Sequence, residues 1–169
     1  IRELALPYLF VMAVLAWRDG SRREAAAWVG AILFSFAALA GHAAALSQHV
    51  LPTDGASQGW SSAGGLPFIL GMLKRCTLFA FLPLSAIAFL LPLTLLGWAG
   101  LRSPSGERAA LILSGFLLAF MAIGRPDNFY WGILIAPLLP IGLAFAPAAL
   151  RDLVAAAAKL RTAAPPATA

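Results

Sequence analysis

Long apolar runs with almost no charge are the feature that most constrains this sequence. A membrane-spanning α-helix needs about 20 mostly apolar residues, within a range of roughly 17–25. Five runs approach or reach that length, and the first is short. We predict spans near residues 4–17, 25–46, 76–101, 109–124 and 131–150. The predicted fold class is therefore all-α: a polytopic integral membrane helix bundle of about five transmembrane helices plus a short interfacial helix.

The composition agrees with this class. Hydrophobic residues make up 61% of the chain and charged residues only 11%, whereas a soluble domain usually carries about 25% charged residues. Too few polar side chains are present to cover a surface that faces water. The net charge of +5 would suggest nucleic acid as a partner for a soluble protein. Here the basic residues fall in short loops between apolar runs, so we expect no nucleic-acid partner.

The third and fifth predicted spans contain prolines in their interior. Pro83 and Pro92 lie in the third span, and Pro137, Pro140 and Pro147 lie in the fifth. Neighbouring helices can satisfy the carbonyl groups that a proline frees inside a membrane. We therefore expect these prolines to kink the helices without breaking them.

The chain divides into a transmembrane domain over residues 1–161 and a C-terminal tail over residues 162–169. The tail is rich in Ala, Pro and Thr, and we expect it to be disordered. Because the chain begins at Ile1 and not at Met, we expect it to be a C-terminal piece of a longer membrane protein, with the missing N-terminal part as a partner.

The basic residues set the predicted orientation. Cytoplasmic loops carry an excess of Lys and Arg. One side of the predicted bundle holds eight of the twelve basic residues: Arg18, Arg22, Arg23, Arg102, Arg108, Arg151, Lys159 and Arg161. The other side holds Arg2, Lys74, Arg75 and Arg125. This asymmetry places the C-terminus in the cytoplasm and residues 124–131 on the outer side.

A long outward loop over residues 47–66 is followed by the short apolar and dibasic sequence FILGMLKR. Asp54 in the loop fits either a turn, as Asp-Gly often does, or an active-site loop. FILGMLKR is too short to span, so we expect a helix in the membrane interface. Lys74 and Arg75 would then contact lipid headgroups, or form a second phosphate-binding cluster that faces Arg125.

The sequence GRPDNFYW, over residues 124–131, places polar and aromatic residues between two apolar runs. Arg125 fits an interfacial anchor, with Tyr130 and Trp131 in the aromatic belt. It also fits an anion site, because the planar guanidinium binds phosphate bidentately. In that case Asp127 and Asn128 would orient Arg125 or bind sugar hydroxyls, and Tyr130 would donate to a phosphate oxygen. Pro126 disfavours helix at Arg125.

The run AALAGHAAA, over residues 37–45, predicts a tightly packed helix, because small side chains let helix backbones approach closely in lipid. His42 within it fits a buried, hydrogen-bonded packing residue better than a proton relay. The single cysteine, Cys76, forms no disulfide within the chain and no Cys-based metal site. We expect no metal site and no cofactor, although the sequence leaves a divalent metal open.

With GRPDNFYWGILIAPLLPIGLAF and GLPFILGMLKR in view, the chain resembles the C-terminal half of a bacterial integral-membrane glycosyltransferase of the GT-C class. In such enzymes a late outward loop often pairs an Arg with a Tyr before a Pro-containing helix, which Arg125, Tyr130 and Pro137 match. The resemblance implies sugar transfer from a polyprenyl-phosphate donor at the outer face of the inner membrane. The catalytic acidic residue of that class lies in an early outward loop, and nothing here matches it.

These observations leave two functional hypotheses. In the first, the chain is the carrier-binding half of such a glycosyltransferase and is surrounded by membrane lipids. The residues expected to bind the donor phosphate or sugar are Arg125, Tyr130, Asn128, Asp127, Lys74 and Arg75. As a fragment without the acidic residue, it would show no turnover by itself. In the second, it is a non-catalytic membrane module, either a transporter segment or an envelope-assembly partner. A transporter would need ionisable residues at mid-membrane depth, and His42 is the nearest candidate.

Overall fold

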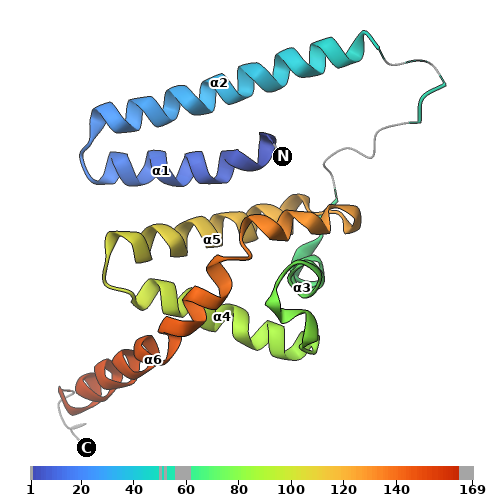
Figure 1. Cartoon of the computed structure of the whole chain (residues 1–169). Helices are drawn as coiled ribbons and strands as arrows, with labels where there is room; N and C mark the ends of the chain where they lie inside the picture. Colours follow the sequence, from blue (N-terminus) through green and yellow to red (C-terminus); the bar gives the residue numbers. More distant parts are fainter. Residues whose placement is uncertain (1, 50, 52, 56–61, 164–169) are drawn as a thin grey trace, which may run out of the picture.

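The computed structural model describes residues 2–49, 51, 53–55 and 62–163 (Figure 1). These residues form α-helices and short 3-10 segments and contain no strand, which confirms the all-α prediction. In chain order the elements are η1 (Arg2–Ala5), α1 (Leu6–Arg18), α2 (Arg22–Ser47), α3 (Gly65–Cys76), η2 (Leu78–Phe81), α4 (Leu84–Gly100), α5 (Pro104–Ile123), η3 (Pro126–Leu134) and α6 (Leu138–Ala163).

Three of the described helices are long and apolar enough to cross a membrane: Arg22–Ser47, Pro104–Ile123 and Leu138–Leu160. The helices α1 and α4 are apolar but shorter. Membrane association is therefore supported by length and composition. The short helix expected around FILGMLKR is α3, which begins at Gly65 and ends at Cys76.

The pairs α1 with α2, α1 with α5 and α4 with α5 are antiparallel, whereas α6 runs in the same direction as α4 (Figure 1). The hairpin of α1 and α2 lies beside α5 through α1, and α4 packs between α5 and α6. Buried side chains from α3, α4, α5, η3 and α6 form one hydrophobic core, whose fully enclosed members include Leu73, Ile87, Leu113 and Phe120. This core holds α3 and η3 together at one end of the molecule.

The closest helix contact joins α4 to α6. Gly97 faces the backbone of Gly142, and a Cβ atom on Gly142 would lie only 2.6 Å from the carbonyl oxygen of Thr94. The indole Nε1 of Trp98 donates to the carbonyl oxygen of Leu138 at 2.7 Å. Small residues thus let two helices meet backbone to backbone, and a buried indole joins them by a hydrogen bond.

The third predicted span, 76–101, is wrong as one continuous helix. Thr77 takes an extended backbone and its hydroxyl oxygen accepts from the N–H of Phe79 at 3.1 Å, which starts η2. Pro83 is also extended, with φ −67° and ψ 154°, and is the N-cap of α4. Pro83 therefore separates two elements, whereas Pro92 lies within α4 as expected. A proline without an N–H is well placed where a helix begins.

The fifth predicted span, 131–150, also has different limits. Residues 131–134 belong to η3, a turn follows, and α6 begins at Leu138. Pro137 interrupts the helical structure there, because a proline disfavours helix at the residue before it. Pro147, in contrast, lies inside α6. The helix continues to Ala163, so the first two residues of the expected disordered tail are helical, and residues 164–169 lie outside the described range.

The expectation of tight packing for residues 37–45 is wrong within the described chain. On α2 only Ala25 and Ile32 are buried, and His42 is exposed. The reason is a difference in length, because α1 has 13 residues and α2 has 26. Ala5, just before α1, lies opposite Ala38 and Leu39 of α2, and the three residues line the same hollow. η1 also contacts α2, and past η1 the described residues 40–47 of α2 are exposed.

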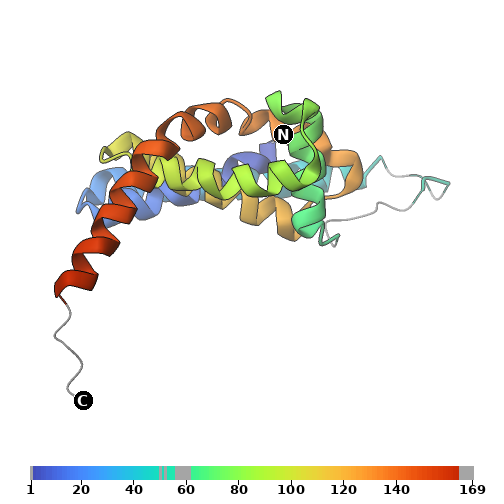
Figure 2. The same ribbon diagram turned by 90° about the horizontal axis from the view of Figure 1, so that it is seen from below.

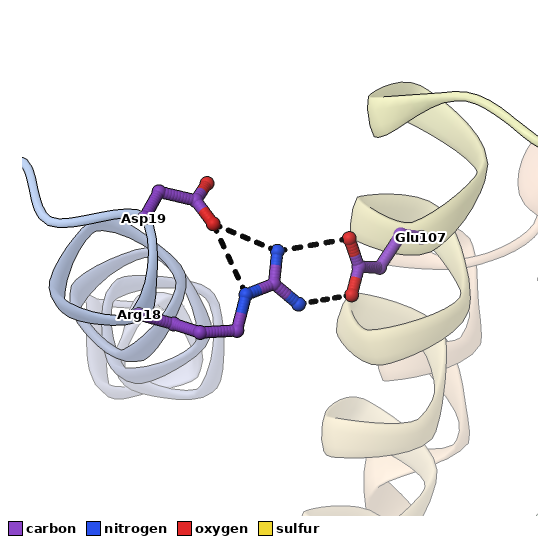
Figure 3. A network of polar contacts seen from close by, with 3 residues as sticks. All are labelled: Arg18, Asp19 and Glu107. Atoms are coloured by element: carbon purple, nitrogen blue, oxygen red, sulfur yellow. Dashed lines mark hydrogen bonds and ion pairs between the residues drawn. The ribbon is translucent and has the colours of Figure 1, made fainter.

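The connectors rich in basic residues gather at one end of the bundle (Figures 1 and 3). Arg18, at the end of α1, lies between Asp19 and Glu107 of α5. Its Nη2 is 2.9 Å from Asp19 Oδ1 and 3.0 Å from Glu107 Oε2. Arg102 pairs with Asp152 of α6 at 3.6 Å. The connectors after α1 and α4 and the later part of α6 thus share one end, called the basic end below.

Reversing the charge of Glu107 should loosen the hairpin of α1 and α2 from α5. Glu107→Arg places two cations opposite each other, and Arg18→Glu in the same chain restores an opposite pair. Val11 and Gly115 face each other across α1 and α5, since a Cβ on Gly115 would lie 3.5 Å from Val11 Cγ2. Disulfide formation between cysteines at these two positions, with Cys76→Ser, should fall in Glu107→Arg and recover in the double reversal. Equal yields in all three chains would contradict this.

Candidate functional site

The sequence GRPDNFYW forms the opposite end of the bundle. Arg125 has an extended backbone with φ −113° and ψ 153°, as expected before a proline. Pro126 then begins η3, and the N–H of Asn128 donates to the carbonyl oxygen of Arg125 at 2.9 Å. A short 3-10 segment therefore replaces an open loop, and it fixes the spacing of the polar side chains.

Arg125 is paired with Asp127. Its Nη2 donates to Asp127 Oδ2 at 2.9 Å and its Nε donates to Oδ1 at 3.2 Å. The Arg125 side chain is 23% exposed and that of Asp127 is 58% exposed. Asn128 is buried, whereas Tyr130 is exposed. The expected orientation of Arg125 by Asp127 agrees with this geometry. The Asn128 side chain lies in the protein interior and the Tyr130 side chain lies at the surface, so the two do not share one environment.

The aromatic residues of this stretch do not all belong to an interfacial belt. Trp131 is buried and packs against the Phe120 ring in the core, with the two rings tilted and their centroids 5.4 Å apart. Phe129 and Tyr130 are exposed and lie edge to face, with their centroids 6.3 Å apart. The belt interpretation is therefore wrong for Trp131, which anchors η3 to α5.

The dibasic pair at the end of α3 is split. The guanidinium carbon of Arg75 lies 5.3 Å from the centroid of the Phe129 ring. The ammonium of Lys74 instead donates to the carbonyl oxygen of Leu82, at the end of η2, at 2.8 Å. Successive side chains on an α-helix are rotated by about 100° around the helix axis, so the Lys74 and Arg75 side chains point in different directions. The structure thus brings Arg75, but not Lys74, to the GRPDNFYW stretch.

A pocket of about 400 Å³ lies between α3 and η3, with the preceding chain as its third side. It is lined by Ser62, Ala63, Gly64, Pro67, Phe68, Gly71, Met72, Arg75, Pro126 and Phe129. Of the six predicted site residues, all of them described, Arg75 belongs to this lining. We call this the α3–η3 pocket. Its walls are mainly apolar, with one cation and the Ser62 hydroxyl among the lining groups.

The pocket contains residues that the sequence interpretation missed. Phe68 and Met72 are four residues apart on α3, and Pro67, Gly71 and Arg75 follow the same spacing one residue earlier. Residues four apart lie on one face of a helix. This spacing was visible in the sequence, and it would have placed Arg75 on the pocket face and Lys74 off it.

The remaining candidates do not join the pocket. Asp54 accepts from the backbone N–H of Leu51 at 2.8 Å, which supports the turn interpretation. Residues 50, 52 and 56–61 of the predicted outward loop lie outside the described range. Within that range, no group of three or more His, Cys, Asp or Glu side chains is arranged to hold a metal ion.

Comparison with protein-family models, with curated proteins and with solved structures gives no match.

The pairing of Arg125 with Asp127 predicts an acid-sensitive contact. Hydrogen bonds from Arg125 hold the pKa of the Asp127 carboxyl below its usual range. Because the pKa is lowered in the fold, the carboxylate stabilises this turn above about pH 4, the ordinary Asp value, and this contribution disappears as the pH falls through the lowered pKa. Carbon NMR should show a titration midpoint for Asp127 below the ordinary value, and Arg125→Gln should raise it. An unchanged midpoint in Arg125→Gln would refute the pairing.

Proposed function

We propose that the α3–η3 end of this chain binds a polyprenyl-phosphate-linked sugar, as the membrane-embedded half of a glycosyltransferase. The observation that carries the proposal is the position of Arg75, held against Phe129 in a pocket with apolar walls. The resemblance of the sequence to the GT-C class supplies the donor class. On this proposal the pocket faces outward from a bacterial inner membrane and the basic end faces the cytoplasm, following the positive-inside rule.

A lipid phosphate needs a cation beside an apolar surface, and the pocket offers both. The Phe129 ring lies against the guanidinium of Arg75. When a ring covers the face of a guanidinium, the N–H donors around its edge stay available for a phosphate. The pocket volume falls within the range of roughly 300–1,000 Å³ of small-molecule sites. The apolar walls formed by Phe68, Met72 and Pro126 suit the first part of a polyprenyl chain.

Arg125 provides a second cation one turn away from Phe129. It contacts Asp127, so a phosphate would share or replace that carboxylate. Tyr130, on the same segment η3, is exposed and can donate its hydroxyl. In a transfer reaction, Arg75 and Arg125 would stabilise the negative charge that develops on the phosphate leaving group, which is often a large catalytic contribution.

The proposal assigns donor binding and leaves the general base unassigned. No carboxylate lines the α3–η3 pocket among the described residues. Asp127, the nearest candidate in sequence, is engaged by Arg125. This observation favours binding without turnover by this chain, which is also what a non-catalytic membrane module would show.

Lipid binding to the full chain in nanodiscs, followed by native mass spectrometry, tests the proposal. The three probes are a long-chain polyprenyl phosphate, the matching polyprenol and phosphatidic acid. We expect the polyprenyl phosphate to bind about tenfold more tightly than the alcohol, since one charge-assisted contact contributes roughly 1.5–3 kcal/mol. Equal binding of phosphate and alcohol would refute a phosphate site. Equal binding of phosphatidic acid would point to an ordinary headgroup site and remove the donor assignment.

A further inference from the structure

The C-terminal part of α6 continues the face that packs against α4, although α4 has ended. Leu139, Ala146 and Ala149 are buried on that face. A Cβ atom on Gly100, the last residue of α4, would lie 3.1 Å from Ala149 Cα. The same spacing of three or four residues leads on to Leu153, Ala156 and Leu160, and these are exposed. The apolar face therefore extends at least two turns past its partner helix.

The ion pairs at the basic end mark where the bundle meets the headgroup region. Charged groups are expensive in the hydrocarbon core and gather at its boundary. Arg18 with Glu107 and Arg102 with Asp152 lie at this level. The apolar length of α6 runs to Leu160, but these ion pairs place the residues after Asp152 beyond the part of the bundle that the hydrocarbon surrounds. Leu153, Val154 and Leu160 are more than half exposed there, which would be unfavourable in water.

The helix also changes direction at this end. Figure 2 shows the last turns of α6 leaving the bundle at an angle to α4 and α5. Pro147 lies inside α6 just before this part. It has no N–H to bond the carbonyl of Leu143, and such a gap is a common cause of a helix bend.

The charged residues of the same segment lie on a different side of the helix. At about 100° per residue, Arg151, Asp152 and Lys159 lie within one third of the helix circumference, whereas Leu153 and Leu160 lie about 160–180° from Arg151 and about 80–120° from the other two. A helix with one apolar and one basic face lies in the membrane interface, with its apolar face about 5–10 Å into the boundary of headgroups and acyl chains. The neighbouring cations at this end, including Arg102 and Arg108, favour anionic lipids.

We propose that residues 153–163 form a surface anchor that lies along an anionic lipid leaflet at the basic end of the bundle. Leu153, Ala156 and Leu160 face the acyl chains, and Arg151 and Lys159 contact lipid phosphates. This assignment is independent of the α3–η3 pocket and requires only that the bundle spans a membrane.

Spin labels on the full chain test the anchor. Single cysteines are introduced as Leu153→Cys, Ala155→Cys, Ala158→Cys and Leu160→Cys, each with Cys76→Ser. All four positions are exposed, so the labels should not disturb the fold. In vesicles of phosphatidylglycerol and phosphatidylcholine, we expect labels at 153 and 160 to be several-fold more accessible to oxygen than to a water-soluble nickel chelate. Labels at 155 and 158 should show the reverse.

Three labelling results would overturn the anchor. Nickel access at all four positions would mean that the helix projects into water, and oxygen access at all four would mean that it spans the bilayer. Spin–spin broadening at 153 and 160 would mean that a second copy covers the face. The combined change Arg151→Glu and Lys159→Glu should abolish the pattern, whereas the matched change Arg22→Glu and Arg23→Glu, at the start of α2, should preserve it. Equal effects of the two double changes would also contradict the assignment.

Discussion

Gly97→Ala should destabilise the folded chain more than a Gly→Ala change at any other glycine of the described helices. A Cβ atom at Gly97 would meet the carbonyl group of Gly142 and would lie 2.8 Å from the backbone N of Ala146. Backbone atoms cannot swing aside as a flexible side chain can, so α4 and α6 must separate. Overpacking of this kind typically costs about 1–3 kcal/mol. Separation would also break the hydrogen bond from Trp98 to Leu138, so we expect a loss of about 3 kcal/mol.

Thermal unfolding of the purified chain in detergent, followed by helix content and tryptophan fluorescence, measures this effect. Gly41→Ala is the matched control, because nothing lies within 4 Å of a Cβ atom at that position of α2. Alanine at an open helix position should stabilise by about 0.5–1 kcal/mol. If Gly97→Ala unfolds at the same temperature as Gly41→Ala, the described contact of α4 with α6 is incorrect.

Arg75→Gln should weaken binding of polyprenyl phosphate about tenfold or more, and Lys74→Gln should change it less than about twofold. The two residues are adjacent and carry the same charge, so they differ mainly in where they point. Arg75 lines the α3–η3 pocket, whereas Lys74 bonds the Leu82 carbonyl. Loss of one charge-assisted contact accounts for about 1.5–3 kcal/mol, which corresponds to roughly 10- to 150-fold in affinity.

Titration of both variants with polyprenyl phosphate in nanodiscs compares them under identical conditions. Glutamine keeps much of the length of either side chain and removes its charge. If the two variants lose affinity equally, the phosphate responds to the general charge of this end and not to the pocket.

The helical class could be predicted from the apolar runs, but the positions of the breaks could not. Pro83 and Pro92 lie in the same run, yet one caps α4 and the other lies inside it. The difference comes from the surroundings, since Thr77 starts η2 and Lys74 holds the Leu82 carbonyl. Such contacts are tertiary and override local preference. The exposure of His42 likewise depends on the length of α1, which does not reach that part of α2.

The candidate site was predictable in part. Arg125, Asp127 and Arg75 stand out from their sequence neighbours, and the pairing of the first two follows from their separation in a tight turn. Lys74 and Arg75 point to different sides of α3. The helical spacing of Phe68 and Met72 in the sequence already indicates which of the two lies on the pocket side. The burial of Trp131 was not predictable, because it requires the ring of Phe120 from another helix.

Photocrosslinking gives the most direct test of the proposed donor site. A polyprenyl phosphate with a diazirine near its phosphate is activated in nanodiscs that contain the full chain, and the labelled peptides are mapped by mass spectrometry. We expect adducts on α3 between Phe68 and Met72 and on η3 near Phe129, competed by unlabelled polyprenyl phosphate and reduced in Arg75→Gln. Adducts concentrated on α2 or at the basic end, or labelling that Arg75→Gln leaves unchanged, would contradict it.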